Sequence, residues 1–306
     1  MKQKLLTTVC ALAFTLPAVA FAGDWQGNAT LGFASSDIDG APDNLTATTL
    51  DLHGEYDTGV GFVLGVDAAI GKLKMSGTPI DESVNYFALT GMYGLSNGLS
   101  VGAYAERGAV SDSTLIPVDL EMTSFGLVLG YSLGSVDGEI YYGTSDTDPS
   151  LPAGIDVNDL GLRAAFSPVQ NVEVNAVIAR TRISGGGPDV DLDLIGLGGS
   201  YAINHALTAF GGVQKASLDI LSADATTIGL GLAYQTAALG IPTTLSLEVA
   251  RTSIDVGGPS EDVDTVRVGI SIPLGKSATS VPLNSVAGAV ANGGHSVLTS
   301  ALLGVF

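Results

Sequence analysis

The chain has 306 residues, 46% of them hydrophobic, and its 31 acidic residues against 12 basic ones give a formal net charge of −19. This excess of acid argues against a nucleic-acid partner, because a protein that binds a polyphosphate needs a basic surface. Beyond residue 22 no apolar run reaches the roughly 18 residues that a membrane-spanning helix requires, so helical spans are excluded and the hydrophobic residues must follow another pattern.

Residues 1–22 have the features of an export signal. A short positive start is followed by an apolar run and by small residues at the two positions that a signal peptidase recognises, Ala20 and Ala22. We therefore expect residues 1–22 to be removed and the mature chain to begin at Gly23. The single cysteine, Cys10, lies in this segment, so the mature chain can hold neither a disulfide nor a thiolate metal site.

From residue 23 onward the dominant period of hydrophobicity is two. Between Trp25 and Phe33, apolar side chains occupy the odd positions and polar residues or glycine the even ones, which places each set on its own face of a β-strand. Fourteen segments show this pattern. Most are near the about 9 to 11 residues with which a tilted strand crosses a bilayer. The predicted strands are 25–34, 47–56, 60–70, 84–94, 99–107, 120–131, 136–144, 157–167, 172–182, 192–201, 207–215, 226–235, 243–252 and 264–274.

The connections between the predicted strands alternate in length. Tight turns that contain glycine, asparagine or proline, such as 57–59 and 95–98, alternate with longer acidic loops. Short turns at one end and longer loops at the other are typical of bacterial transmembrane barrels, whose short turns face the periplasm. The sequence therefore predicts an all-β fold, a transmembrane antiparallel up-and-down β-barrel of about 14 strands over residues 23–275.

Aromatic residues recur at one height of the predicted barrel. An outward-facing aromatic precedes each tight turn, at intervals of 33 to 38 residues, and two more belong to ascending strands. The set is Trp25, Tyr56, Phe62, Tyr93, Tyr131, Phe166, Tyr201 and Tyr234. Aromatics at a fixed depth form the girdle at a membrane interface, whereas a soluble β-sandwich does not need its core aromatics at one height.

Taken together, the export signal, the alternation, the loop asymmetry and the aromatic girdle resemble those of Gram-negative outer-membrane porins and related channel barrels, over residues 23–274. The resemblance implies a place in the outer membrane of a Gram-negative bacterium, among its lipid and lipopolysaccharide. The chain departs from general porins in strand number, since those usually have roughly 16 strands. It also lacks their long third loop folded into the lumen, because no loop here exceeds about 12 residues.

The end of the chain does not fit the barrel pattern. Barrels of this kind commonly finish on an aromatic residue of the last strand, but here a tail of residues 276–306 follows and ends on Phe306. As a further strand the tail would make the strand number odd, which bacterial single-chain barrels avoid. It can instead be a helix or other segment on the periplasmic side, or a plug inside the barrel. Phe306 can serve recognition by the barrel assembly machinery.

The face opposite the apolar stripe carries the charges of the predicted lumen. Nine carboxylates oppose two arginines there, and one histidine accompanies them. The predicted pore-lining residues are Asp51, His53, Glu55, Asp67, Glu106, Asp137, Glu139, Asp159, Arg163, Glu173, Glu248 and Arg267. Other inward positions are small, for example Gly65, Gly196 and Gly229, which leaves room for water. Lumenal carboxylates favour cations, although these charges can also merely solvate the interior or pair across strands, as Glu248 and Arg267 can.

Catalytic and metal-binding patterns are weak. His53 has Asp51 and Glu55 as neighbours on the same face, but residues two apart on a strand are separated by about 6.6 Å, so a polar lumenal wall explains the trio better than a catalytic group. We therefore expect no enzymatic activity and no cofactor. The acids between Asp189 and Asp193 and between Glu261 and Asp264 can bind divalent cations, but a solvated acidic rim explains them better because they lack EF-hand spacing.

Most basic residues fall at the loop end of ascending strands, in the outward parity. They are Lys72, Lys74, Arg107, Arg180, Arg182, Lys215 and Arg251. An outward cation costs only about 0 to 1 kcal/mol near the membrane interface. Lipopolysaccharide carries phosphates that suit charge-assisted contacts from Arg and Lys, so we expect a lipopolysaccharide-binding rim; the alternative is snorkelling of these side chains without a partner.

The sequence thus predicts a passive aqueous channel for small hydrophilic solutes that prefers cations. The alternative is a structural or adhesive barrel with a blocked lumen. A transporter of hydrophobic compounds would need an N-terminal plug before the first strand, for which Trp25 leaves no room. Neither the identity of the solute nor the oligomeric state follows from these patterns.

Overall fold

The computed structural model describes residues 23–40, 44–75, 77, 81–111, 119–238, 240–258, 260–275 and 281–305. These residues form fourteen strands, the short 3₁₀ helix η1 (Asp219–Leu221) and the helices α2 (Val286–Asn292) and α3 (Val297–Val305). The strands are β1 (Asp24–Ile38), β2 (Leu45–Asp57), β3 (Phe62–Met75), β4 (Asp81–Gly94), β5 (Leu99–Ser111), β6 (Leu120–Leu133), β7 (Val136–Asp148), β8 (Asp156–Val169), β9 (Val172–Ser184), β10 (Val190–Ala202), β11 (Leu207–Leu218), β12 (Ala223–Ala238), β13 (Ile241–Val256) and β14 (Glu261–Gly275).

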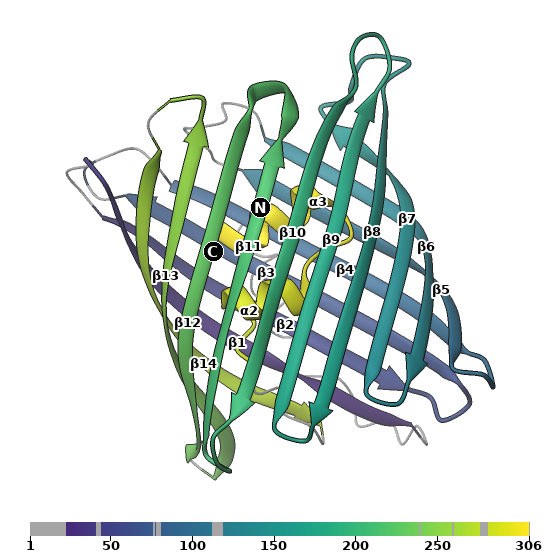
Figure 1. Cartoon of the computed structure of the whole chain (residues 1–306), viewed down its shortest axis with the longest axis vertical. Coiled ribbons are helices and arrows are strands. Elements are labelled where there is room, and N and C mark those ends of the chain that lie inside the picture. The colour runs from purple at the N-terminus through teal and green to yellow at the C-terminus, as the bar shows by residue number, and fades with distance from the viewer. Residues whose placement is uncertain are drawn as a thin grey trace, which may run out of the picture.

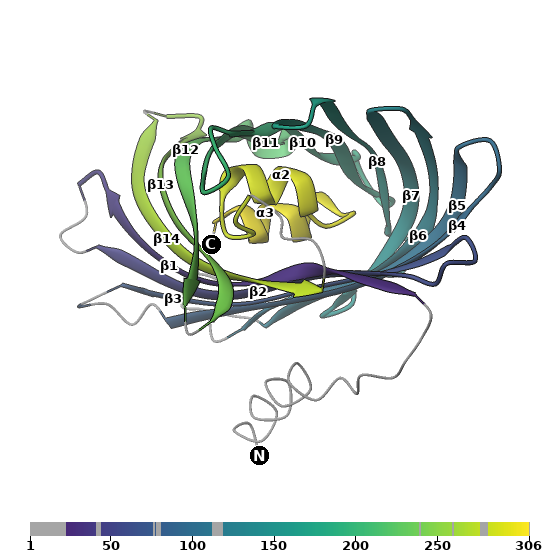
Figure 2. The same cartoon turned by 90° about the horizontal axis from the view of Figure 1, so that it is seen from below.

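The strands form one closed antiparallel barrel in which every strand pairs with its neighbours in sequence and β1 pairs with β14 (Figures 1 and 2). The closing register runs from Gln26 opposite Gly275 to Ile38 opposite Val263, without interruption. Each predicted strand is present, so the prediction of a barrel of about 14 strands is confirmed. Closure satisfies the backbone groups that an open sheet would leave at its edges, which a bilayer cannot hydrate.

The strands are longer than the sequence pattern indicated, mostly at the end that bears the longer loops. Strand β1 continues to Ile38 and β5 to Ser111, four residues past each predicted end. At the opposite end the turns are tight, and Gly98 in the β4–β5 turn adopts a φ of 83°, which a side chain would disfavour. The loop asymmetry expected of a transmembrane barrel is therefore present.

The wall has two different faces. Along β6 the burial alternates residue by residue, with Met122, Ser124 and Val128 buried on the inside and Phe125 and Leu127 exposed on the outside. Leucine, isoleucine, valine and aromatic side chains form the exposed outer face of the other strands as well. This outward apolar surface is the one that a bilayer would cover. Within the described residues, no helix is both long and apolar enough to span a membrane.

The end of the chain lies inside the barrel. After β14, residues 281–305 form α2, a linker and α3, and both helices are enclosed by the strands in the end-on view (Figure 2). We call residues 281–305 the C-terminal plug. Ser285 caps α2 by accepting a hydrogen bond from the Gly288 N–H, and Val286, Ala287, Gly288 and Val290 are buried. A helix that is apolar on nearly all sides is stable only when it is enclosed.

Inward glycines of β10, β11 and β12 make the seat for α2, which contacts β9 through β12. A Cβ added at Gly196 would lie 2.9 Å from a methyl group of Val290, and one at Gly229 would lie 2.7 Å from a methyl group of Val286. A Cβ at Gly212 would lie 3.1 Å from the backbone N of Ala287. The expectation that such glycines leave room for water is therefore wrong on this wall, because the side chains and backbone of α2 fill the space. Gly65, by contrast, faces the lumenal cavity described below.

Candidate functional site: the lumen and the C-terminal plug

Glu106, an inward residue of β5, binds the linker between α2 and α3. Its Oε2 accepts the backbone N–H of His295 at 2.8 Å and its Oε1 accepts the backbone N–H of Ser296 at 3.0 Å. The hydroxyl of Thr299 donates to Oε1 at 2.8 Å, and Tyr86 on β4 donates to Oε2 at 3.2 Å. A carboxylate that is only 2% exposed needs such donors, because an unpartnered buried charge is costly.

Arg163, an inward residue of β8, binds the same linker through its carbonyl groups. Its Nη2 donates to the carbonyl oxygens of Gly293 and Gly294, and its Nη1 donates to Glu139 on β7 at 3.2 Å. The guanidinium carbon also lies 5.3 Å from the centre of the Tyr141 ring. Arg163 and Glu106 together therefore engage both kinds of backbone hydrogen-bonding group in one short segment.

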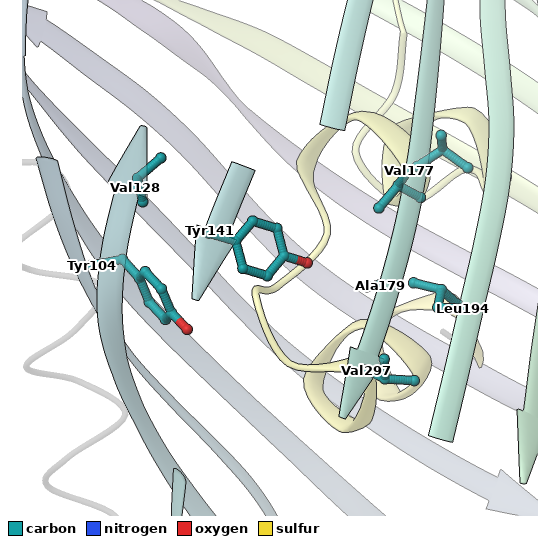
Figure 3. Close-up of a cluster of buried hydrophobic side chains, with 8 residues drawn as sticks. Tyr104, Val128, Tyr141, Val177, Ala179, Leu194 and Val297 are labelled. Carbon is teal, nitrogen blue, oxygen red and sulfur yellow. The ribbon is translucent and has the colours of Figure 1, made fainter. Parts of the chain in front are cut away.

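The side chain of His295 enters an aromatic slot. Its ring stacks on Tyr104 with centroids 3.8 Å apart and an interplanar angle of 9°, and it meets Tyr141 edge-on at 4.8 Å. Figure 3 shows Tyr104 and Tyr141 projecting from the wall on one side of the linker, with Val297 of α3 beside Ala179 and Leu194 on the other. Val177, Val128 and Val290 complete this buried cluster. Apolar contacts thus hold the linker and α3 in addition to the hydrogen bonds of Glu106 and Arg163.

Asp159, Thr181 and Ser145 form a third polar attachment on neighbouring strands. Asp159 accepts hydrogen bonds from Thr181 at 2.6 Å and from Ser145 at 2.5 Å. The Thr181 hydroxyl then accepts the backbone N–H of Val297, the first residue of α3, at 2.9 Å. Asp159 is fully buried, so it orients the threonine instead of facing solvent.

Glu248 and Arg267 form a buried ion pair of 2.8 Å between β13 and β14. Glu248 also accepts the backbone N–H of Val286 at 3.0 Å, where α2 begins. The cross-strand pairing that the sequence suggested for these two residues is therefore present. The pair faces the plug, and neither side chain is more than 5% exposed.

A cavity of about 380 Å³ remains beside the plug. Its charged lining consists of His53, Glu55, Asp67, Asp137, Glu139, Arg163 and His295. Tyr131 and Ser132 also line it, so it extends toward the end of the barrel that carries the short turns. His53 pairs with Asp67 at 2.6 Å, and Glu139 with Arg163. Four carboxylates against one arginine leave this cavity acidic.

The other predicted pore-lining residues are placed on the inner face but outside this cavity. Asp51 accepts a hydrogen bond from Thr49 at 2.8 Å, and Glu173 accepts one from Asn175 at 2.9 Å. The interpretation of all twelve residues as solvent-facing pore lining needs correction. Glu106, Asp159, Glu248 and Arg267 are buried at 4% exposure or less, because the plug or a neighbouring strand covers them.

Several residues of this site are not predicted by the sequence pattern. They are His295 in the tail and the tyrosines Tyr86, Tyr104 and Tyr141 of the wall. The signal for the three tyrosines is their inward parity, since all three are buried on the inner face, whereas Phe87 and Tyr93 of β4 and Tyr142 of β7 face outward. Bulky inward aromatics in a glycine-rich lumen indicate contact with something inside it.

Comparison with known proteins agrees with this architecture. The sequence profile described as Gram-negative porin matches residues 124–283, which is more than half of the chain. The chain belongs to the Gram-negative porin family. No curated protein sequence matches it.

Solved structures similar to this porin include an anion-selective porin from Comamonas acidovorans, with 14% identity and a TM-score of 0.50 over 82% of this chain and 99% of that chain. Another is the TodX monoaromatic hydrocarbon channel deltaS2 mutant, with 13% identity and a TM-score of 0.51 over 83% of this chain and 91% of that chain. At this level of identity the likeness concerns the fold alone.

Six of the seven outward basic residues of the predicted rim form ion pairs with acids of adjacent strands. Arg180 pairs with Asp193 and Asp191, and Arg182 pairs with Asp191. The remaining pairs are Arg107 with Glu121, Lys215 with Asp224, Arg251 with Asp264 and Asp262, and Lys74 with Asp81. Lys72 is exposed on the same outer face. Each paired cation is thus largely neutralised within the protein.

The aromatic residues of the predicted girdle lie at the short-turn end. Six of them are exposed on the outer face, namely Phe62, Tyr93, Tyr131, Phe166, Tyr201 and Tyr234. Trp25 and Tyr56 are partly buried, and the centroids of their rings are 6.3 Å apart.

The predicted acidic sites for divalent cations have other partners, because Asp191, Asp193 and Asp264 bind arginines. Among the described residues, no group of three or more His, Cys, Asp or Glu side chains is arranged to hold a metal ion.

Proposed function

We propose that this porin is a channel for passive diffusion of small hydrophilic solutes, that it prefers cations, and that the C-terminal plug closes it at rest. The observation that carries the proposal is a closed barrel whose inner face holds both an acidic cavity and a segment of the chain's own end. The pore-lining role is assigned to the cavity acids Glu55, Asp67, Asp137 and Glu139 together with His53 and Arg163.

Cation preference follows from the balance of charge in this cavity. Glu139 is neutralised by Arg163, and Asp67 is hydrogen-bonded to His53, which leaves Glu55 and Asp137 as the cavity acids outside these two pairs. Carboxylates in a narrow, poorly hydrated passage concentrate cations and repel anions. The effect weakens at high salt, because the Debye length falls to about 3 Å at 1 M.

A structural or adhesive barrel with a blocked lumen is the second candidate, and the plug favours it. The described part of the plug is buried against the wall through charged, polar and apolar contacts. The two candidates differ in whether the plug ever leaves its seat under conditions in which the barrel stays closed. They therefore make opposite predictions for ionic current.

Planar bilayers distinguish these candidates. We expect the complete mature chain to give small or intermittent currents, and Val290→Asp, which places a charge against Gly196 and Gly198, to raise the mean conductance.

In a KCl gradient the reversal potential should show cation selectivity. Exchanging Glu55 and Asp137 together for Gln and Asn should reduce it, whereas Asp189→Asn with Glu261→Gln should not. An anion-selective current contradicts the cation preference, and absence of current in every variant supports the blocked barrel.

We further propose that the outward ion pairs form a rim that contacts lipopolysaccharide in the outer leaflet. Exposed ion pairs contribute only about 0 to 1 kcal/mol, so a phosphate can displace the carboxylate from an arginine, and the released acid can share a bridging divalent cation. The rim consists of Lys72, Lys74, Arg107, Arg180, Arg182, Lys215 and Arg251. Replacing Arg107, Arg180, Lys215 and Arg251 with Gln should reduce co-purified lipopolysaccharide and its stabilisation of the barrel. Unchanged values would indicate snorkelling alone.

Export and insertion complete the proposal. We assign residues 1–22 to a signal that is removed, residues 23–275 to the barrel and residues 276–306 to the tail. The aromatic set described above is proposed as the periplasmic girdle. Phe306 lies outside the described residues, and its proposed role is recognition by the barrel assembly machinery.

A further inference from the structure

The barrel wall holds the linker of the plug through its main chain. Glu106 accepts two consecutive N–H groups, those of His295 and Ser296, and Arg163 donates to two consecutive carbonyl groups, those of Gly293 and Gly294. Thr181 accepts the next N–H, that of Val297. Five consecutive residues therefore present their backbone to three inward side chains of β5, β8 and β9.

These contacts require little of the bound sequence. Two of the five residues are glycine, and their carbonyl groups are common to every peptide. Only His295 adds a large side chain, which occupies the slot between Tyr104 and Tyr141. Such a set of groups can bind any short peptide in the same conformation that carries a flat ring at the third position and small residues before it.

The inward side chains of the wall lose hydrogen-bond partners when the plug leaves. Glu106 is 2% exposed and would then keep only Tyr86 as a protein partner among the contacts above. When the plug leaves, Glu106 loses the plug's N–H and hydroxyl donors and Arg163 loses two carbonyl acceptors while keeping Glu139, so the charged groups need new hydrogen-bond partners in the lumen. Water can fill part of this role. A peptide fills it with the same atoms that the plug supplies, so it can compete with the plug for one site.

The cavity provides access to this site from the side. Its lining includes Arg163 together with Asn292, Gly293 and His295 of the plug, so a solute in the cavity touches the linker before the plug moves. Glu55 and Asp137 line the same cavity and suit the ammonium group of a free peptide amino terminus. The cavity therefore connects the solvent at the short-turn end with the groups that bind the linker.

We propose that the wall formed by Glu106, Arg163, Thr181 and the two tyrosines is a peptide-backbone-binding site, occupied at rest by residues 293–297, and that short peptides are solutes that displace the plug. This inference rests on the proposed channel function and names its solute class. The plug is then an internal competitor, and a peptide that binds in its place opens the passage that it uses.

The first experiment monitors the plug in the complete mature chain. Because the only natural cysteine is Cys10, Ala301→Cys in α3 gives a unique position for a spin label. The probe is the tetrapeptide Gly-Gly-His-Ser, acetylated and amidated at its ends. We expect millimolar peptide to raise the mobility of the label. The analogue methylated at the backbone nitrogens of His and Ser cannot donate to Glu106 and should require at least about ten times the concentration.

Two outcomes overturn the inference. If the methylated analogue is as effective as the parent peptide, Glu106 does not bind the peptide through its backbone N–H groups. If tetramethylammonium mobilises the label at the same concentration, the site responds to charge and not to peptides. Glu106→Gln in the labelled chain should reduce the difference between peptide and analogue, because the amide offers one acceptor oxygen instead of two, while Glu173→Gln, which is inward but bonded to Asn175, should preserve it.

A second measurement needs no substitution. Hydrogen exchange of the unmodified chain, followed by mass spectrometry over residues 293–305, should become several times faster when the tetrapeptide is added and remain unchanged with the methylated analogue. Equal exchange rates with and without the tetrapeptide overturn the inference. Neither readout depends on ionic current. A plug that peptide releases in a barrel without conductance contradicts the channel function alone, and a conducting barrel whose plug ignores peptide contradicts only this inference.

Discussion

Glu106 of β5 and His295 of the plug lie 189 residues apart in the chain, and the backbone N–H of His295 donates to Glu106 Oε2 at 2.8 Å. The imidazole Nδ1 of the same histidine lies 3.3 Å from this oxygen. Because the carboxylate is buried, its charge is stabilised mainly by groups of the plug. The contact therefore couples the charge of Glu106 to the position of the C-terminal plug.

Replacing Glu106 with glutamine should loosen the plug while the strands of the barrel stay paired. Hydrogen bonds to charged groups contribute about 1.5 to 3 kcal/mol each, and the amide supplies one acceptor where the carboxylate supplies two. We expect greater mobility of a label at position 301 and longer open times in bilayers. Glu173→Gln removes a charge from the same inner face away from the plug and should have little effect; equal effects from both variants would mean that lumenal charge alone matters.

Filling the glycine seat should expel α2. In Gly196→Val the new side chain would overlap both Val290 and Val177, since even its Cβ would lie 2.9 Å from each. The plug can move more easily than a paired strand, so we expect the barrel to fold and the plug to become accessible to protease. Gly65→Val is the matched control, because a Cβ at Gly65 meets only Thr90 at an ordinary 3.5 Å. Protection of the plug in both variants would contradict this role of Gly196.

The ion pair between Glu248 and Arg267 should show strong coupling. Arg267→Met leaves a buried carboxylate without its cation and should lower the free energy of unfolding by about 3 to 5 kcal/mol, as for other buried pairs. Exchanging Glu248 for Gln in the same chain should restore much of that loss, because the remaining amide carries no charge. Urea titration of the folded fraction in detergent gives the double-mutant cycle. Additive losses would show that the two side chains act independently.

Deleting residues 277–306 should leave a folded barrel, because the closing register between β1 and β14 ends at Gly275. The deletion uncovers Glu106, Glu248 and Arg163, so the melting temperature should fall while the conductance rises. Strand content by circular dichroism and the heat-dependent shift in electrophoretic mobility measure folding. A truncated chain that cannot fold would show that the plug is required for barrel assembly.

The strands and their order could be predicted because the necessary information is local. Alternation between Trp25 and Phe33 assigns each side chain to a face, and glycine-containing turns such as 95–98 determine which strands are adjacent. An even number of strands then allows the first and last to pair. The outward placement of Arg180 and Arg251 followed from the same parity.

The contents of the lumen depended on tertiary structure. Parity placed Gly196 and Glu106 on the inner face, but it carries no information about what lies across the barrel. The sequence of α2 is small and apolar, and its burial depends on contacts with glycines about 60 to 90 residues earlier. Likewise, Arg180 and Asp193 had to be brought into register before the cation could be seen as paired. Short-range patterns thus determined the wall of this porin, and long-range contacts decided that its own C-terminal segment fills the space inside.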